Sequence, residues 1–94
     1  MRTLVWGTTF VRAFRRMAKH QPGLRRKVES VLELLAEDSF HPILRSHKLK
    51  GELAGLWACT VDYNIRILFE LVQNPETGEE EIFLVTMGTH DEVY

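Results

Sequence analysis

The stretch NIRILFELVQ, residues 64–73, has the composition of a β-strand, because β-branched and large apolar residues fill most of it. Two similar runs flank it, LWACTV at residues 56–61 and EIFLVT at residues 81–86. Residues 62–64 (DYN) can form a tight turn before the central strand, and residues 74–78 (NPETG) a looser turn after it. The sequence therefore predicts a three-stranded antiparallel meander in its second half.

One short strand and two helices are predicted upstream of the meander. Residues 3–6 (TLVW) form an apolar run that stops at Gly7, after which Thr8 or Thr9 can cap a helix that extends to about residue 20. Pro22 breaks this helix, and a second helix is expected over residues 24–37. Apolar residues recur at helical spacing in both: Phe10, Phe14, Met17 and Ala18 in the first helix, and Leu24, Val28, Val31, Leu32 and Leu35 in the second.

This order of elements predicts an α+β fold in a single domain, residues 1–94. An N-terminal strand is followed by an αα-hairpin and then by the antiparallel meander, and the helices pack on one face of the sheet. Trp6, Trp57 and Cys59 are expected in the core. The opposite face of the sheet is expected to be partly open.

Composition excludes several classes of protein. The hydrophobic content of 45% and charged content of 27% are those of an ordinary globular domain. One cysteine cannot form an internal disulfide, and four scattered histidines suggest no zinc site, so no cofactor is expected and the reducing cytoplasm is the expected location. No apolar run approaches the roughly 18 residues that span a bilayer, and the first residues do not resemble a signal peptide, so no membrane partner is expected.

The net charge of -1 conceals two oppositely charged halves. Residues 1–50 contain eleven of the twelve Lys and Arg residues and four acids, a net charge near +7. Residues 51–94 contain Arg66 and nine acids, a net charge near -8. A basic surface suits a phosphate-backbone partner, although a solvated surface is the simpler explanation of both halves.

A group of polar residues falls where the predicted sheet could bring them together. Arg66 interrupts the central strand, and residues 87–94 (MGTHDEVY) follow the last strand, whose pattern Gly88 breaks. The complete group is Arg45, His47, Lys48, Lys50, Arg66, His90 and Tyr94. Cleavage of RNA without a metal needs such residues: a base for the 2′-hydroxyl, cations for the charge that grows on the phosphate, and an acid for the leaving oxygen. Histidine can act as acid or base near neutral pH, and arginine grips two phosphate oxygens at once.

Each of these residues also has a purely structural explanation. Arg66 could pair with Glu52, Asp62 or Glu70, and His90 could be a solvated histidine. His47 could belong to an ordinary basic loop, and Tyr94 could pack its ring on the edge of the core. Spacing alone favours a nuclease only weakly over a protein that binds RNA or another protein without catalysis.

Three local motifs, taken in order, resemble the RelE/ParE superfamily of bacterial and archaeal toxins, and its YafQ-like mRNA interferase branch in particular. Residues 47–51 (HKLKG) are similar to the H-x-L-x-G loop of the family, and residues 63–69 (YNIRILF) to its Y-R-I-hydrophobic strand. Residues 88–94 (GTHDEVY) are similar to its closing G-T-H/K-x-x-(V/L)-(Y/F) motif. The resemblance covers nearly the whole chain and implies the same α+β fold.

The resemblance also implies an activity, partners and roles for particular residues. It implies an endoribonuclease that cuts mRNA in the ribosomal A site, next to ribosomal RNA, and that a cognate antitoxin inhibits. His47 and His90 match the catalytic histidines, Arg66 the arginine that stabilises the phosphate, and Tyr94 the aromatic residue that orients the nucleotide. Thr60 and Asn64 replace a His and an Asp of the YafQ type, and Trp57 and Cys59 replace the paired lysines of RelE.

Three functional hypotheses follow. In the first, the chain is a toxin that cleaves mRNA: His90 or His47 takes the 2′-hydroxyl proton, Arg66 with Lys48 or Lys50 stabilises the charge, Arg45 adds to substrate binding, and Tyr94 holds the base. In the second, a ParE-like toxin poisons DNA gyrase through a binding surface. In the third, a degenerate toxin binds only its antitoxin, because Thr60 and Asn64 cannot act as acid or base.

Overall fold

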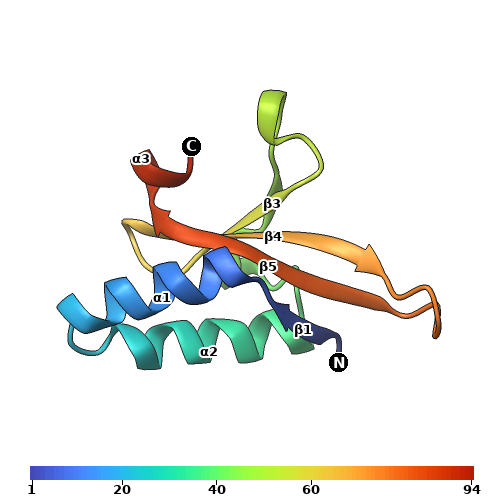
Figure 1. Ribbon diagram of the computed structural model, residues 1–94, viewed down its shortest axis with the longest axis horizontal. Coiled ribbons are helices and arrows are strands. Elements are labelled where there is room, and N and C mark those ends of the chain that lie inside the picture. Colours follow the sequence, from blue (N-terminus) through green and yellow to red (C-terminus); the bar gives the residue numbers. More distant parts are fainter.

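The computed structural model describes residues 1–94 as a five-stranded mixed sheet with two long helices on one face (Figure 1). The strands follow the order β1-β5-β4-β3-β2 across the sheet, where β1 pairs with β5 in parallel and the other pairs are antiparallel. The elements are β1 (Thr3–Trp6), α1 (Thr8–His20), α2 (Leu24–Glu37), β2 (His47–Lys48), β3 (Trp57–Thr60), β4 (Ile65–Gln73), β5 (Glu80–Thr89) and α3 (His90–Val93). Two 3-10 turns, Pro42–Leu44 and Gly51–Leu53, flank β2. The predicted α+β class, the helical hairpin and the meander are confirmed.

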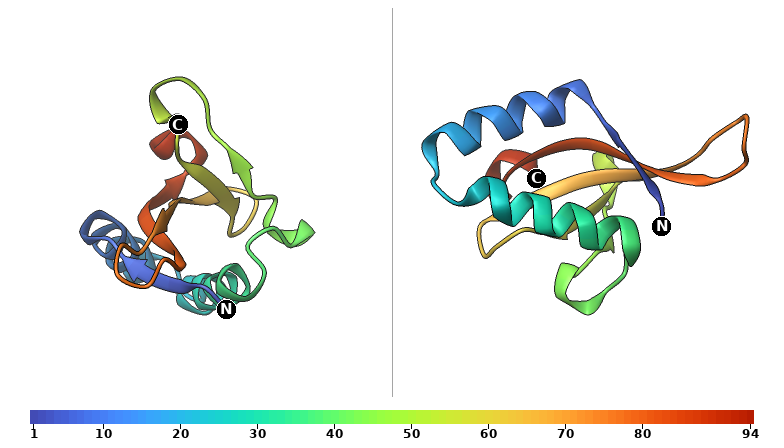
Figure 2. Two further views of the ribbon diagram at one scale, coloured as in Figure 1. Left: turned by 90° about the vertical axis from the view of Figure 1, so that its right-hand side faces the viewer. Right: turned by 90° about the horizontal axis from the view of Figure 1, so that it is seen from below.

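The core lies between the sheet and the helical hairpin (Figure 2). The predicted stripes of both helices are buried there, except that Ala18 and Val31 are only partly buried. Alternate residues of β4 such as Ile65, Ile67 and Phe69 are buried with them. Cys59 is buried, as expected, and Trp57 packs against the core from β3. Trp6 was expected in the core, but its side chain is 45% exposed because β1 is an edge strand.

The first helix begins differently from the prediction. Thr8 and Thr9 are both inside α1, and the N-cap residue is Gly7, with extended backbone and no side-chain cap. A Cβ atom on Gly7 would lie 2.4 Å from the carbonyl oxygen of Leu84, so only glycine allows this close contact between the β1–α1 junction and β5. The Gly7 amide donates to the same carbonyl, at 3.0 Å.

The last strand is longer than predicted, and a β-bulge decides which side its end faces. Leu68 pairs with Thr86 but Phe69 pairs with Leu84, so Val85 is an extra residue in β5. The bulge keeps Met87 in the core and turns Gly88 to the opposite face. Gly88 was expected to break the strand; it instead pairs with Arg66, and β5 continues to Thr89.

The segment after β5 is a helical turn, α3, fixed by a capping box. The Thr89 hydroxyl accepts a hydrogen bond from the Glu92 amide, and the Glu92 carboxylate accepts one from the Thr89 amide. These bonds lower the pKa of Glu92. The His90 amide also donates to the carbonyl of Asn64, at 3.0 Å, which joins α3 to the β3–β4 turn. α3 lies on the face of the sheet that α1 and α2 leave open (Figure 1). No helix in the chain is long and apolar enough to cross a membrane.

Candidate active site

Arg66 lies on the open face near one end of β4, the strand that is flanked by β3 and β5. It is paired with Thr60 on one side and with Gly88 on the other, so these three residues share a face. One terminal nitrogen, Nη1, donates to the carbonyls of Asp62, Tyr63 and Ile65 at 2.8, 3.1 and 3.2 Å. The other two nitrogens of the guanidinium, Nη2 and Nε, have no partner in the chain, and no carboxylate lies within 4.0 Å of the group. Arg66 therefore keeps its full charge and a free hydrogen-bonding edge.

An open cleft of about 530 Å³ lies beside this arginine. Three of the predicted site residues, Arg45, His47 and Arg66, line it together. The other lining residues are Ile43, Thr60, Asp62 and Tyr63. The cleft thus brings two guanidinium groups and an imidazole to one place, although they come from the segment before β2, from β2 and from β4.

His47 is oriented by a bond to its own loop. Arg45 adopts the left-handed conformation (φ 51°), and its carbonyl oxygen lies 3.0 Å from His47 Nδ1. A carbonyl can only accept, so Nδ1 carries the proton, and the neutral ring presents an unprotonated Nε2. His47 is therefore arranged to accept a proton at Nε2.

His90 is the first residue of α3, and Tyr94 directly follows its last residue. α3 continues from β5, which flanks β4 on the side away from β3. The rings of His90 and Tyr94 pack edge to face with centroids 4.5 Å apart, and His90 Nδ1 lies 3.6 Å from the Asp91 carboxylate. Burial raises the pKa of Tyr94, and the nearby Arg66 charge only partly offsets this effect. Tyr94 is therefore a neutral hydrogen-bond donor at physiological pH and lies within the electrostatic reach of Arg66. No contact joins His47 to His90.

The two predicted lysines do not line the cleft. Lys48 pairs with Trp57, which faces the helices, and its Nζ lies 5.5 Å from the centroid of the Trp57 ring. Lys48 is therefore on the opposite face of the sheet from Arg66. Lys50 is exposed at the start of the 3-10 turn Gly51–Leu53, outside the cleft.

Four residues differ from the catalytic motifs of the toxins that the chain resembles, and none of them is placed to act as an acid or a base. Thr60 lines the cleft beside Arg66, and the carbonyl of Asn64 holds the His90 amide. Trp57 stacks on Phe69 in the core. Burial raises the pKa of the Cys59 thiol to about 12, so this residue is inert.

The turn that holds Arg66 is braced from two directions. Asp62 Oδ1 accepts hydrogen bonds from the amides of Asn64 and Ile65 at 2.9 and 3.0 Å, and Oδ2 lies 3.6 Å from Lys27 Nζ on α2. Partial burial opposes ionisation of Asp62, but these amide bonds and the Lys27 charge outweigh it and lower the pKa of the carboxyl group. Asp62 is thus engaged by other groups, which explains why it does not neutralise Arg66.

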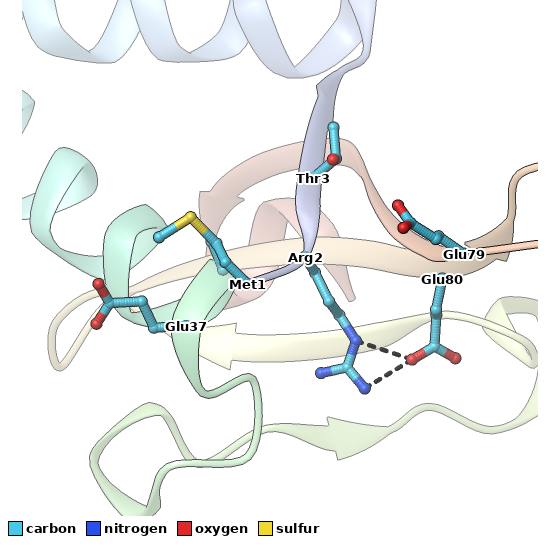
Figure 3. A pocket seen from close by; sticks show the side chains of 7 residues that line it. Met1, Arg2, Thr3, Glu37, Glu79 and Glu80 are labelled. Atoms are coloured by element: carbon cyan, nitrogen blue, oxygen red, sulfur yellow. Dashed lines mark hydrogen bonds and ion pairs between the residues drawn. The ribbon is translucent and has the colours of Figure 1, made fainter. Parts of the chain in front are cut away.

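A second cavity, at the other end of β5, is built for stability (Figure 3). There the Arg2 side chain lies against Glu80, with Nε 2.8 Å and Nη2 2.7 Å from the same carboxylate oxygen. The Nη1 atom of Arg2 donates to the hydroxyl of the buried Ser39, at 2.9 Å. All three guanidinium nitrogens are engaged, so Arg2 has no free nitrogen for a ligand in this cavity.

Three features of the site were missed from sequence. Tyr63 and Ile43 line the cleft, yet Tyr63 was assigned only to a turn. The capping box that fixes α3 was also missed, although its Thr89-x-x-Glu92 spacing can be read from the sequence. Nothing in the sequence could indicate Ile43, since its place depends on how residues 42–44 fold against β2.

The geometry can be compared with known proteins at the level of family and fold. A family model for the bacterial YafQ toxin of type II toxin–antitoxin systems matches residues 2–94. A search of curated protein sequences gave no significant match. The fold is similar to YafQ from E. coli BL21(DE3), with TM-score 0.76, 14% identity and coverage of 100% of this chain and 99% of that one.

Two further solved structures share the fold. A YoeB/ParE toxin from Agrobacterium tumefaciens has TM-score 0.75 at 16% identity, with coverage of 94% of this chain and 98% of that one. YafQ in the E. coli DinJ–YafQ toxin–antitoxin complex has TM-score 0.75 at 15% identity, with coverage of 99% and 97%. At these identities the structures establish the fold alone, whereas the family model spans nearly every residue. The chain therefore belongs to the YafQ family of bacterial type II toxin–antitoxin toxins.

Proposed function

We propose that this toxin is a metal-independent endoribonuclease that cleaves mRNA on the ribosome by attack of a 2′-hydroxyl on the adjacent phosphate. The observation that carries the proposal is the state of Arg66: a cation with a free hydrogen-bonding edge, no acidic partner, and a histidine in the same cleft. A fixed guanidinium is suited to the negative charge that develops on a phosphate during the reaction.

The proposed reaction assigns a role to each neighbour of Arg66. His47 or His90 takes the proton of the 2′-hydroxyl, and the other histidine protonates the leaving 5′-oxygen. The oriented tautomer of His47, with its bare Nε2, favours His47 as the base. Arg66 and Arg45 stabilise the phosphate, and Tyr94 orients the nucleotide. The products are a 2′,3′-cyclic phosphate and a free 5′-hydroxyl.

The proposal differs from the sequence hypothesis in its choice of cations. Lys48 and Lys50 were expected to bind the substrate, but both lie outside the cleft. They can still contact a longer RNA or ribosomal RNA, where phosphates extend beyond the scissile one. Arg45 takes the place of the lysines beside Arg66, because it lines the same cleft.

Primer extension on a reporter mRNA in a purified translation system tests the activity. Cuts that appear only with ribosomes are expected from the wild-type protein, and His47→Ala and His90→Ala should each reduce them by on the order of a hundredfold or more. His20→Ala is the matched control, because His20 is exposed at the end of α1 and does not line the cleft. Wild-type cutting by His90→Ala would remove His90 from the mechanism.

The same experiment separates the alternatives. If the folded wild-type protein makes no cuts, the proposal is wrong, and a gyrase-cleavage assay then distinguishes a ParE-like poison from a degenerate toxin. A gyrase poison would retain its effect in the His47→Ala, His90→Ala double variant, since a binding surface needs no acid–base pair.

We also infer that an antitoxin protein inhibits this toxin in the cytoplasm, where mRNA is translated. The inference is supported by membership of a toxin–antitoxin family and by the similarity of the fold to YafQ in its complex with DinJ. Co-expression with the gene next to that of the toxin, followed by co-purification and loss of toxicity, would test it.

A further inference from the structure

Tyr63 is the most exposed large hydrophobic residue of the chain, yet it belongs to the cleft. Its exposed fraction is 96%, whereas the ring of Tyr94 is 43% exposed. No core residue packs on it, so folding gains almost nothing from an aromatic ring at this position. It lines the same cleft as His47 and Arg66.

The backbone beneath Tyr63 is held on both sides. Asp62 accepts the amides of Asn64 and Ile65, and its ion pair with Lys27 joins the turn to α2. On the cleft side, Nη1 of Arg66 donates to the carbonyl oxygen of Tyr63, at 3.1 Å. A ring on a braced turn loses little further conformational freedom when a ligand covers it, which favours binding.

A second exposed apolar side chain lines the same cleft. Ile43 is 71% exposed, in a 3-10 turn whose start is fixed by the bond from the Ile43 amide to His41 Nδ1, at 3.1 Å. Arg45 and Arg66 line the cleft together with these two side chains. A ligand that suits this cleft has a flat apolar part joined to an anion, which describes a nucleotide of a single strand.

Tyr63 and Tyr94 belong to the segments that follow β3 and β5, the two strands that flank β4 and its Arg66. Arg66 donates to the Tyr63 carbonyl, and its charge acts on the Tyr94 hydroxyl. A scissile phosphate joins two nucleotides, so a phosphate on Arg66 directs one base toward each tyrosine. Tyr94 alone would leave the second base without a partner.

We propose that Tyr63 forms a second nucleobase subsite, which stacks on the base on one side of the phosphate bound by Arg66 while Tyr94 holds the base on the other side. This inference rests on the proposed function, since it takes single-stranded RNA as the ligand. It gives Tyr63 a binding role and no part in proton transfer.

Binding of an uncleavable probe tests the subsite without any need for catalysis. The probe is a fluorescein-labelled 2′-O-methyl RNA octamer of mixed sequence, followed by anisotropy at several salt concentrations. Tyr63→Ala should weaken binding by roughly 5- to 100-fold, the effect of one lost base–aromatic stack, and Tyr63→Phe should bind like the wild type. The slope of log K against log salt should be unchanged in Tyr63→Ala and reduced by about 0.7 in Arg45→Gln.

An abasic octamer with the same number of phosphates is the matched control. The wild type and Tyr63→Ala should bind it equally, because the missing bases leave nothing to stack. Equal binding of the base-bearing probe by the wild type and Tyr63→Ala would overturn the subsite, as would an equal loss on both probes or no binding by the wild type. Failure of the proposed function is separate: a protein that binds through Tyr63 but never cuts mRNA would keep the subsite and lose the nuclease.

Discussion

Arg2 and Arg66 lie near opposite ends of β5 and are used in opposite ways. Arg2 engages Glu80 through two nitrogens (Figure 3). Its third nitrogen donates to Ser39, so the charge of Arg2 is neutralised and each of its nitrogens has a partner. Arg66 donates through one nitrogen to three neutral carbonyls and has no acid within 4.0 Å. A neutralised arginine stabilises a fold, whereas a fixed and uncompensated arginine is ready for an anion from outside.

The difference lies in what the neighbouring acids do. Glu80 is free to pair with Arg2, because it stands at the start of β5 with no other partner. Asp62 lines the same cleft as Arg66, but two backbone amides and Lys27 already engage its carboxylate. The carbonyls of the turn thus accept hydrogen bonds from Arg66, while the Asp62 carboxylate is bound by the two amides and Lys27. Substitutions at both ends of β5 can test this comparison.

Loss of the Arg66 charge should have the largest effect. Arg66→Gln is expected to lower the rate of mRNA cleavage by roughly 10²- to 10³-fold, because it removes a donor that meets charge in the transition state. Arg66→Lys should recover only a small part, since an ammonium group lacks the fork that grips two oxygens. Primer extension measures both rates. Cleavage by Arg66→Gln within a few fold of the wild type would make Arg66 as structural as Arg2.

A methyl group added at Gly88 should disturb the site indirectly, through its contact with α3. The added Cβ would lie 3.1 Å from Val93 Cγ1 and 3.2 Å from Glu92 Cβ, so α3 must give way by a few tenths of an ångström. Gly88→Ala is expected to lower cleavage by roughly 3- to 10-fold through a small misplacement of His90 and Tyr94. Thermal unfolding should change little, because Gly88 packs against α3 and not against the helical core. Thr9→Ala, in the first turn of α1, is a control of similar size, and full activity in Gly88→Ala would show that the position of α3 does not matter.

Loss of the Arg2 charge should affect stability and leave the chemistry intact. Arg2→Gln is expected to lower the free energy of unfolding by about 1 kcal/mol, since it breaks a partly exposed ion pair and a hydrogen bond to Ser39. Urea denaturation measures this change, and cleavage per folded molecule should match the wild type. Glu80→Gln should lower the free energy of unfolding to a similar extent. The loss in the Arg2→Gln, Glu80→Gln double variant should be smaller than the sum of the losses in the two single variants. A large loss of cleavage in folded Arg2→Gln would contradict the division between the two arginines.

The two arginines also mark how far the sequence could be interpreted. The helix at residues 24–37 was predicted with its observed bounds, because its apolar spacing and its flanking Pro-Gly are local signals. The edge position of β1 and the exposure of Trp6 were not predicted, since both depend on a parallel pairing with β5, residues 80–89. Local pattern therefore identified the elements but not the solvent exposure of an edge strand.

Prediction of the site from sequence depended on long-range pairing more than prediction of the helices and strands did. The sequence selected Arg45, His47 and Arg66, and the cleft brings them together. It could not place Lys48, because a two-residue pairing with β3 decides which face the side chain takes. It could not show that Gly88 faces Arg66, because that depends on the bulge at Val85. The roles of all these residues in catalysis stay predictions.

The smallest expected effect concerns Asp62, whose ionisation supports the turn under Arg66. Its pKa is lowered in the folded chain from the ordinary value of 3.8, so the ionised group contributes stability that is present above about pH 4. This contribution disappears as the pH falls through the lower pKa of the folded state, because protonation weakens the amide bonds and ends the ion pair with Lys27. Asp62→Asn keeps an oxygen acceptor without a charge, and it should therefore be slightly less stable than the wild type at pH 7 and approach it near pH 2 to 3. Urea unfolding at the two pH values measures this difference, with Asp91→Asn as the fully exposed control. A stability gap that does not narrow in acid would mean that the Asp62 charge does not hold the turn, and the free state of Arg66 would then need another cause.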